Sequence, residues 1–270
     1  MTIEGTEEEQ LVSPDLAGTR QNGAAGDPPQ HRLISKILAP AVKLWLRSQL
    51  EQVETLQVEV EAGDRQLLSG AIGRVNVVAQ AAIYRGLHLT QAQVSGENIR
   101  TNLNQMLRGK PFRLLAEFPI SGRVCLNAAD LNASLKAPLL ANAVIDFLLL
   151  LLKSEGDDEL AGQSVQDLTL SDPQATLGDG QITLNTTLIS VGGTAIPVVV
   201  RTGLTIENGQ ILKLDRPQWL PHANAQRGLP LKELHGFAFD LGPQAALEEL
   251  TITPEQIVCR GRLVVTPEPI

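Results

Sequence analysis

The sequence predicts an α+β protein in which two main helices are each followed by a meander of antiparallel strands. Two segments, 33–52 and 128–153, carry the apolar periodicity of helices. Between and after them, short runs of alternating apolar and polar residues are joined by polar turns, which indicates antiparallel strands. The order is therefore helix, meander, helix, meander in a chain of 270 residues, long enough to bury a large core.

Residues 1–32 predict a disordered tail, because Gly, Pro, Glu, Gln and Asp dominate them. We therefore expect one folded domain at 33–270. The tail lacks the basic start and apolar run of a secretory signal. The longest apolar run, 147–152, is far below the ~18 residues of a transmembrane helix. We expect a cytoplasmic chain that is at most peripheral on a membrane.

The first helix, 33–52, is amphipathic. At 100° per residue, apolar side chains that include Leu44 form one wide face, and Lys36, Lys43 and Arg47 gather on the opposite face. Pro40 should kink the helix or mark its start. The basic face is either the solvated side of a helix packed on a sheet, or a membrane-surface face whose cations meet anionic head groups.

A second basic cluster lies in the sequence RGKPFR at 108–113. It is either a turn with solvated charges or a site for lipid phosphates. The candidate membrane and head-group residues are therefore Lys36, Lys43, Trp45, Arg47, Arg108, Lys110 and Arg113.

The first meander follows the first helix. The apolar residues change from odd-numbered positions at Leu89 to even-numbered positions at Ala92, which suggests a bulge between them. The strands are expected at 53–62, 74–83, 87–94, 97–106 and 112–126, with a break near Pro119.

The second helical zone starts at a cap formed by Asn127 or Asp130, and Pro138 divides it. Its part 139–152 is apolar around almost the whole circumference, which is typical of a helix that is buried or meets lipid. Two interpretations stay open: core filling between sheets, or the wall of a groove that holds an acyl chain. The candidate groove residues are Leu140, Val144, Phe147, Leu148 and Leu151.

The second meander contains two strong hairpin signals, Asp179-Gly180 and Asn208-Gly209. A long loop that carries Trp219 is expected at 215–230. The strands are expected at 164–170, 174–177, 181–190, 195–206, 209–214, 236–241, 247–252 and 256–265.

Composition and motifs exclude several classes of function. Aromatic residues make up 3% of the chain and its net charge is −8, which argues against nucleic acid as a partner. No motif of nucleophilic or metal-dependent catalysis is present, and the four histidines are isolated. Cys125 and Cys259 read as small buried apolar residues. We expect no catalytic residue, no metal site and no cofactor; the oligomeric state stays open.

Four stretches resemble, in order, a known bacterial family. They are LISKILAPAVKLWLRSQLEQVETLQVEVEAGDRQLLSGAIGRVNV, GLHLTQAQVSGENIRTN, ADLNASLKAPLL and HGFAFDLGPQAALEELTITPEQIVCRGRLVV. Over about 33–266 the chain is similar to the LmeA-type phospholipid-binding proteins, in their cyanobacterial branch. The resemblance implies phospholipid binding at the cell envelope. It also implies a long, strongly curved antiparallel sheet wrapped on helices around an apolar groove, similar to tubular lipid-binding domains.

We therefore expect a non-catalytic phospholipid-binding protein that acts at a membrane surface and holds an acyl chain in an apolar groove. One alternative is a structural or scaffolding protein of the envelope that binds no ligand. The other is a lipid hydrolase whose catalytic triad assembles only in space. A continuous apolar cavity would favour lipid binding, whereas a His beside a Ser or Cys in that cavity would favour the hydrolase.

Overall fold

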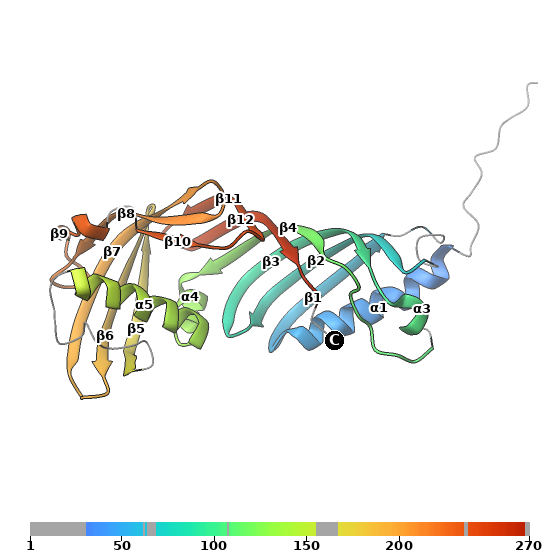
Figure 1. Ribbon diagram of the computed structural model, residues 1–270, viewed down its shortest axis with the longest axis horizontal. Helices are drawn as coiled ribbons and strands as arrows, with labels where there is room; N and C mark the ends of the chain where they lie inside the picture. Colours follow the sequence, from blue (N-terminus) through green and yellow to red (C-terminus); the bar gives the residue numbers. More distant parts are fainter. Residues whose placement is uncertain are drawn as a thin grey trace, which may run out of the picture.

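The computed structural model describes residues 31–61, 63, 69–106, 108–154, 167–234 and 237–267. Almost all of the predicted tail, 1–32, and the start of the strand predicted at 164–170 lie outside these residues. Figure 1 shows an elongated molecule with two sheets at opposite ends of its long axis and a long helix beneath each sheet.

The helices and strands follow the predicted order, helix, meander, helix, meander. The first half contains α1 (His31–Gln49), β1 (Gln52–Glu61), β2 (Ala71–Tyr84), β3 (Leu87–Arg100), α3 (Leu103–Met106) and β4 (Phe118–Asn127). Next come α4 (Ala128–Ser134), α5 (Pro138–Ser154), β5 (Leu168–Gly178), β6 (Gln181–Ser190), β7 (Ala195–Glu207) and β8 (Ile211–Trp219). The chain ends with β9 (Leu229–Pro230), η2 (Lys232–Leu234), β10 (Ala238–Asp240), β11 (Ala245–Ile252) and β12 (Gln256–Val265).

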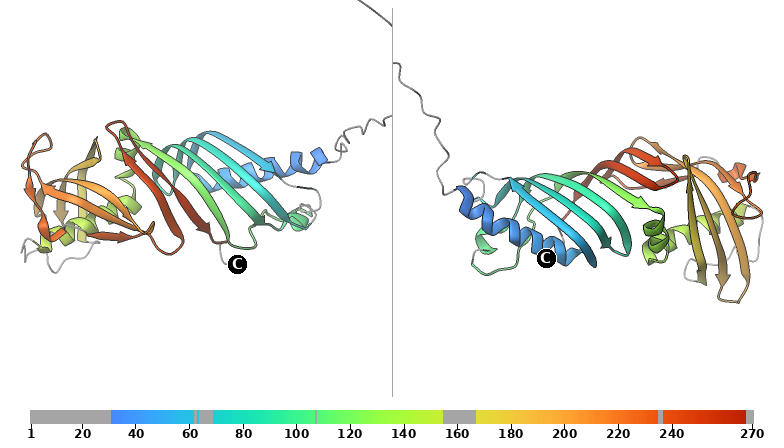
Figure 2. Two further views of the ribbon diagram at one scale, coloured as in Figure 1. Left: turned by 90° about the horizontal axis from the view of Figure 1, so that it is seen from above. Right: turned by 180° about the vertical axis from the view of Figure 1, so that it is seen from behind.

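Both sheets are antiparallel and open. The first has the strand order β1-β2-β3-β4-β12-β11, so the last two strands of the chain return to the sheet that the first four began. The second has the order β10-β8-β7-β6-β5, with β9 paired to β8. The α+β class is therefore confirmed. The sheets are two separate layers (Figure 2) rather than the single wrapped, tube-like sheet that the family resemblance implied.

The first meander differs from prediction after β3. The strand expected at 97–106 is divided: its first part extends β3 to Arg100, and its last part forms the short helix α3. Residues 112–117 are irregular, with one isolated bridge between Leu114 and Thr101. Pro119 does not break a strand but lies inside β4, paired with Val264 of β12.

The bulge predicted near Leu89 is wrong, because β2 and β3 keep one register along their length. Ala81 of β2 instead adopts a φ of 46°. On β2 the buried positions change from Val75 and Ala79 to Ala82 across this residue. A positive φ reorients the backbone locally, so the buried side chains change from odd-numbered to even-numbered positions while the strand pairing continues.

The second meander is more regular than predicted. The strands expected at 164–170 and 174–177 are one strand, β5, with an irregular register between Ser171 and Gln174. The expected loop 215–230 begins later, because β8 continues through Trp219. Both hairpin turns are present, and Asn208 and Gly209 have φ angles of 53° and 74°, as the type I′ geometry requires.

A helical corner joins the two halves. Asn127 caps α4 by accepting the N–H of Asp130 at 2.8 Å, and the Asp130 carboxylate accepts the hydroxyl of Thr90 on β3. The Asn132 side chain donates to the carbonyl of Ala175 at 2.9 Å and accepts its N–H at 2.7 Å. This amide takes the place of a neighbouring strand at the outer edge of β5 and fastens the second sheet to α4.

Helix α5 begins at Pro138 and forms the core of the second half. Its buried positions, which include Leu148 and Leu151 at 0% exposure, spread over more than half of the helix circumference. They belong to one core cluster with residues of β5–β8 and with Leu231, Leu234, Phe237 and Phe239. Phe147 meets Phe237 with ring centroids 6.2 Å apart. These partners explain much of the apolar circumference. Among the side chains described on α5, the exposed ones lie near its start and on a stripe with Leu139, Asn142, Ala143 and Asp146.

We predict that Leu148→Trp lowers the free energy of unfolding by about 1–3 kcal/mol, because added volume at a fully buried position forces its neighbours apart. Urea denaturation measures the loss. Leu139→Trp is the matched control on the same helix, since Leu139 is 55% exposed. Equal stability of the two variants would mean that Leu148 faces free space, as a lipid groove along α5 requires.

We also predict that Asn132→Ala costs about 1–3 kcal/mol, because both backbone groups of Ala175 lose their partner. Asn142→Ala, at an exposed position of α5, should leave the unfolding midpoint unchanged. Hydrogen exchange adds a local test: the amide of Ala175 should lose protection in Asn132→Ala and keep it in the control.

Candidate functional site

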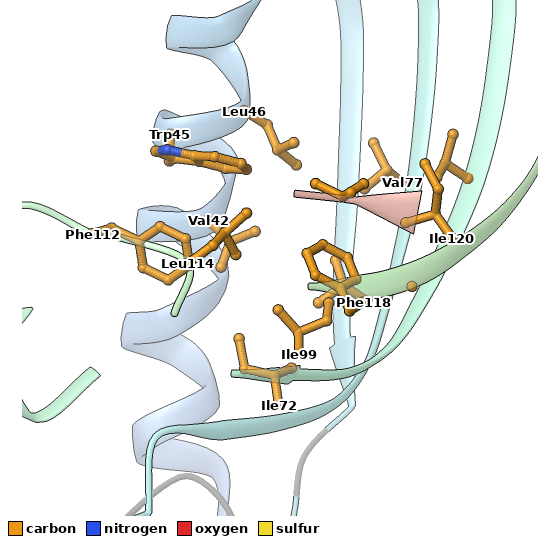
Figure 3. Close-up of a pocket in the computed structure, with 14 residues that line it drawn as sticks. Val42, Trp45, Leu46, Ile72, Val77, Ile99, Phe112, Leu114, Phe118 and Ile120 are labelled. Atoms are coloured by element: carbon orange, nitrogen blue, oxygen red, sulfur yellow. The ribbon is translucent and has the colours of Figure 1, made fainter. Parts of the chain in front are cut away.

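An apolar cavity of about 160 Å³ lies between α1 and the first sheet (Figure 3). The sheet forms one wall, α1 forms a second, and the irregular segment 111–117 contributes a third. The lining residues are Val42, Trp45, Leu46, Ile72, Val75, Val77, Val94, Gly96, Ile99, Phe112, Leu114, Phe118, Ile120 and Val265.

The lining of this cavity contains no charged side chain, and no His, Ser, Thr or Cys. It therefore offers an occupant dispersion contacts and escape from water, but no directional hydrogen bond. An engineered cavity of ~150 Å³ lined by Leu, Ile and Phe stays dry and binds benzene. The cavity under α1 is thus suited to part of a hydrocarbon chain and unsuited to a polar ligand.

Local sequence explains how the cavity forms. Val42, Trp45 and Leu46 are spaced i, i+3 and i+4, so they share the inner face of α1. On β3, Gly96 keeps the wall thin: an added Cβ would lie 3.1 Å from Phe118 and 3.3 Å from Ile99. Glycine therefore leaves room for Phe118, and a larger residue would push that ring toward the cavity.

The segment 111–117 is held over the cavity by a buried amide. Asn102, 6% exposed, donates from Nδ2 to the carbonyl of Pro111 at 2.8 Å, and its Oδ1 accepts the N–H of Arg113 at 2.7 Å. These bonds flank Phe112, whose ring lies 5.6 Å from that of Trp45 on α1. Sequence reasoning missed Asn102 and Phe112, because Asn102 fell within a predicted strand, and Phe112 fell in the basic cluster 108–113 at the start of another.

The structure brings the two predicted basic segments together through the contact between Trp45 and Phe112. Lys43 and Arg47 are exposed on the outer side of α1, whereas Trp45 turns inward and lines the cavity. Lys36 lies on α1, but its side chain is outside the described set. The remaining predicted head-group residues, Arg108, Lys110 and Arg113, are exposed in the segment that carries Phe112.

These exposed cations are available to an external anion. Within the described residues, none of Lys43, Arg47, Arg108, Lys110 and Arg113 takes part in an ion pair. Several basic residues of the sheets do form such pairs, as Arg74, Lys213 and Arg260 do with carboxylates of neighbouring strands.

One residue of α1 contradicts the predicted apolar face. Leu44 is 71% exposed, because the buried face is centred on Leu38 and Val42, at 0% and 4% exposure. Leu44 lies about 200° around the helix from Val42. It therefore shares the outer surface with Lys43 and Arg47.

The predicted groove residues of α5 lie away from this cavity. Phe147, Leu148 and Leu151 are buried in the core of the second half, and Leu140 and Val144 are half-buried beside α4 and the sheets. None of the five lines the cavity under α1. A lipid-binding role for them stays a prediction.

The described residues show little sign of reactive chemistry. They contain no group of three or more His, Cys, Asp or Glu placed to hold a metal ion. Burial chiefly, and then the neighbouring Cys125, raise the pKa of the Cys259 thiol. A protonated, half-buried thiol is a poor nucleophile. In the described part of the chain, no helix has both the length and the apolar character to span a bilayer.

The fold is thus an open antiparallel sheet with a helix over an apolar cavity. Comparison with known families identifies the class more closely: the family of LmeA-like phospholipid-binding proteins matches residues 30–262. The chain belongs to this family, as the sequence resemblance predicted. No curated protein and no solved structure matches the sequence. Placement in a cyanobacterial branch stays a prediction.

We predict that Asn102→Ala releases Phe112 from Trp45 and lowers stability by about 1–3 kcal/mol, because Pro111 and Arg113 lose their buried partner. In a Trp219→Phe background, Trp45 is the one remaining tryptophan, since the chain has two. Its fluorescence should shift to the red as water reaches the ring. Gln105→Ala, at an exposed position of α3, is the control and should keep the original spectrum.

Proposed function

We propose that the chain is a non-catalytic protein that binds a phospholipid at a membrane surface, with an acyl chain in the cavity between α1 and the first sheet. The observation that carries this proposal is the wholly apolar lining of that cavity in a member of a phospholipid-binding family. An aliphatic chain has no hydrogen-bonding groups, and the side chains that line this cavity offer no charged or hydroxyl group that would need a polar partner.

The cavity would supply most of the affinity. Each methylene that leaves water stabilises binding by about 0.8 kcal/mol. The cavity of about 160 Å³ holds only part of an acyl chain, so we place the end of one chain inside and the rest toward the membrane. Movement of Phe112 away from Trp45 would lengthen the site, because these rings close it on the side of the 111–117 segment.

The cations around the site would orient the lipid. Lys43, Arg47, Arg108, Lys110 and Arg113 are exposed, and we assign them to the phosphates of anionic head groups, together with Lys36. Each contributes at most about 1 kcal/mol near an anionic surface. This attraction is screened over ~8 Å at physiological ionic strength, so it should depend on salt while the apolar contribution does not.

Native mass spectrometry of the purified full chain, followed by lipid extraction, tests the proposal. We expect a mass shift that corresponds to a phospholipid and disappears after extraction into organic solvent. A chain that carries no lipid, and takes up none from added phospholipid vesicles, would contradict it.

We predict that Val77→Phe reduces the amount of bound lipid, because its side chain lines the cavity and a larger ring would occupy the space (Figure 3). The fold should survive, since the added volume enters existing space rather than a packed core. Val191→Phe is the matched control, because Val191 is 81% exposed in the β6–β7 turn. Phosphate analysis of the extracted lipid should show a loss in Val77→Phe alone.

A further inference from the structure

Three segments far apart in the sequence form one continuous ridge along the lower side of the molecule. We name residues 43–51, 84–86 and 136–139 the lower ridge. Figure 1 and the view from behind in Figure 2 show α1, the adjoining ends of β2 and β3, and the α4–α5 corner following one another along this side. The ridge therefore reaches from the first half of the molecule to the start of the second.

Direct contacts hold the three segments of the lower ridge together. The N–H of Glu51 donates to the carbonyl of Ile83 at 2.9 Å, and the N–H of Gly86 donates to the Glu51 carboxylate at 2.9 Å. Gly86 packs so closely on the α4–α5 corner that an added Cβ would lie 2.5 Å from Cβ of Ala137. These contacts join the backbones of the three segments into one surface.

The lower ridge is basic in an acidic protein. It contains the cations Lys43, Arg47, Arg85 and Lys136 and one carboxylate, Glu51, which gives it a net charge of +3 in a chain of net charge −8. All four cations are exposed, and within the described residues none forms an ion pair. The Glu51 carboxylate already accepts the Gly86 N–H. With Glu51 included, the ridge thus keeps a net positive charge.

Exposed apolar side chains alternate with these cations. Leu44 is 71% exposed, Leu139 is 55% exposed and Tyr84 is 40% exposed. The Arg85 guanidinium lies 5.4 Å from the centre of the Tyr84 ring, which keeps both groups at the tip of the turn.

We propose that the lower ridge is the surface by which the protein docks on an anionic phospholipid bilayer. Aliphatic side chains at such an interface enter the boundary between head groups and acyl chains, and Lys and Arg meet the phosphates. Tyr favours the head-group level. This inference rests on the proposed lipid-binding function and adds the orientation of the protein on the bilayer. The exposed residues of α1, which include Leu44, act together with Arg85, Lys136 and Leu139. The contact surface therefore reaches from the first half of the molecule to the start of the second.

Vesicle sedimentation with the full chain tests the charged part of the ridge. We use vesicles of phosphatidylglycerol and phosphatidylcholine in equal parts, and vesicles of phosphatidylcholine alone. The variant Arg85→Glu/Lys136→Glu should partition onto the mixed vesicles roughly tenfold or more weakly at low salt. The matched control, Arg227→Glu/Lys232→Glu, makes the same change of charge at exposed positions of the second half and should bind like the wild type.

The apolar part of the ridge has its own pair of variants. Leu44→Ser/Leu139→Ser should weaken partition at low and at physiological salt alike, because apolar insertion is not screened. Leu229→Ser/Leu241→Ser is the control, at positions 69% and 40% exposed. All four are surface substitutions, so unfolding midpoints should agree with the wild type. The docking proposal is overturned if the ridge variants partition like the wild type, or if the controls lose as much binding.

Lipid extraction from the same proteins separates this inference from the proposed function. If both hold, Arg85→Glu/Lys136→Glu keeps the lipid of the wild-type chain while its vesicle binding falls. Wild-type protein without lipid, combined with ridge-dependent vesicle binding, would overturn the cavity proposal and support docking. If every variant carries lipid and the ridge substitutions leave vesicle binding unchanged, the cavity proposal is supported and the docking proposal is overturned.

Discussion

The width of the first sheet is the constraint on which the rest of the structure depends. Six strands spaced ~4.8 Å apart form a layer about 24 Å wide, whereas one helix with its side chains is about 10–12 Å across. Helix α1 therefore covers only part of the apolar face. The segment 111–117 covers a further part, and Phe112 meets Trp45 between the two. The cavity is the volume that neither covering element fills.

In the second half, the helix and its neighbours cover the apolar face of the sheet more completely. Helix α5 is more apolar than α1, and Leu231, Leu234, Phe237 and Phe239 add to the core cluster that α5 forms with β5–β8. Leu148 and Leu151 are consequently enclosed. In the first half, the covering segment meets α1 through the Phe112 and Trp45 rings. It is held by the amide of Asn102 and by backbone hydrogen bonds from Asn102 N–H to Arg113 and from Leu115 N–H to Arg100. The buried Asn102 amide thus adds to the backbone bonds that keep the cavity wall in place.

Helix α1 has an inner apolar face and an outer exposed face, and this links the cavity to the membrane proposal. Its inner residues, Val42, Trp45 and Leu46, line the cavity. Its outer residues, Lys43, Leu44 and Arg47, face solvent on the lower ridge. A lipid held inside and a bilayer met outside would therefore be separated by the thickness of one helix. The turn 84–86 and the α4–α5 corner extend that outer surface toward the second half.

By itself the sequence determined the family and the elements whose signals are local: the two main helices, a cap at Asn127 or Asp130, a division of the second helical zone at Pro138, and the turns at Asp179-Gly180 and Asn208-Gly209. Only the tertiary structure decided where the empty space lies. An apolar residue looks the same in the sequence whether or not a neighbour from a distant segment fills the volume beside it. The lower ridge depends on tertiary structure for the same reason, because Arg47, Arg85 and Lys136 become neighbours only when backbone contacts join their segments.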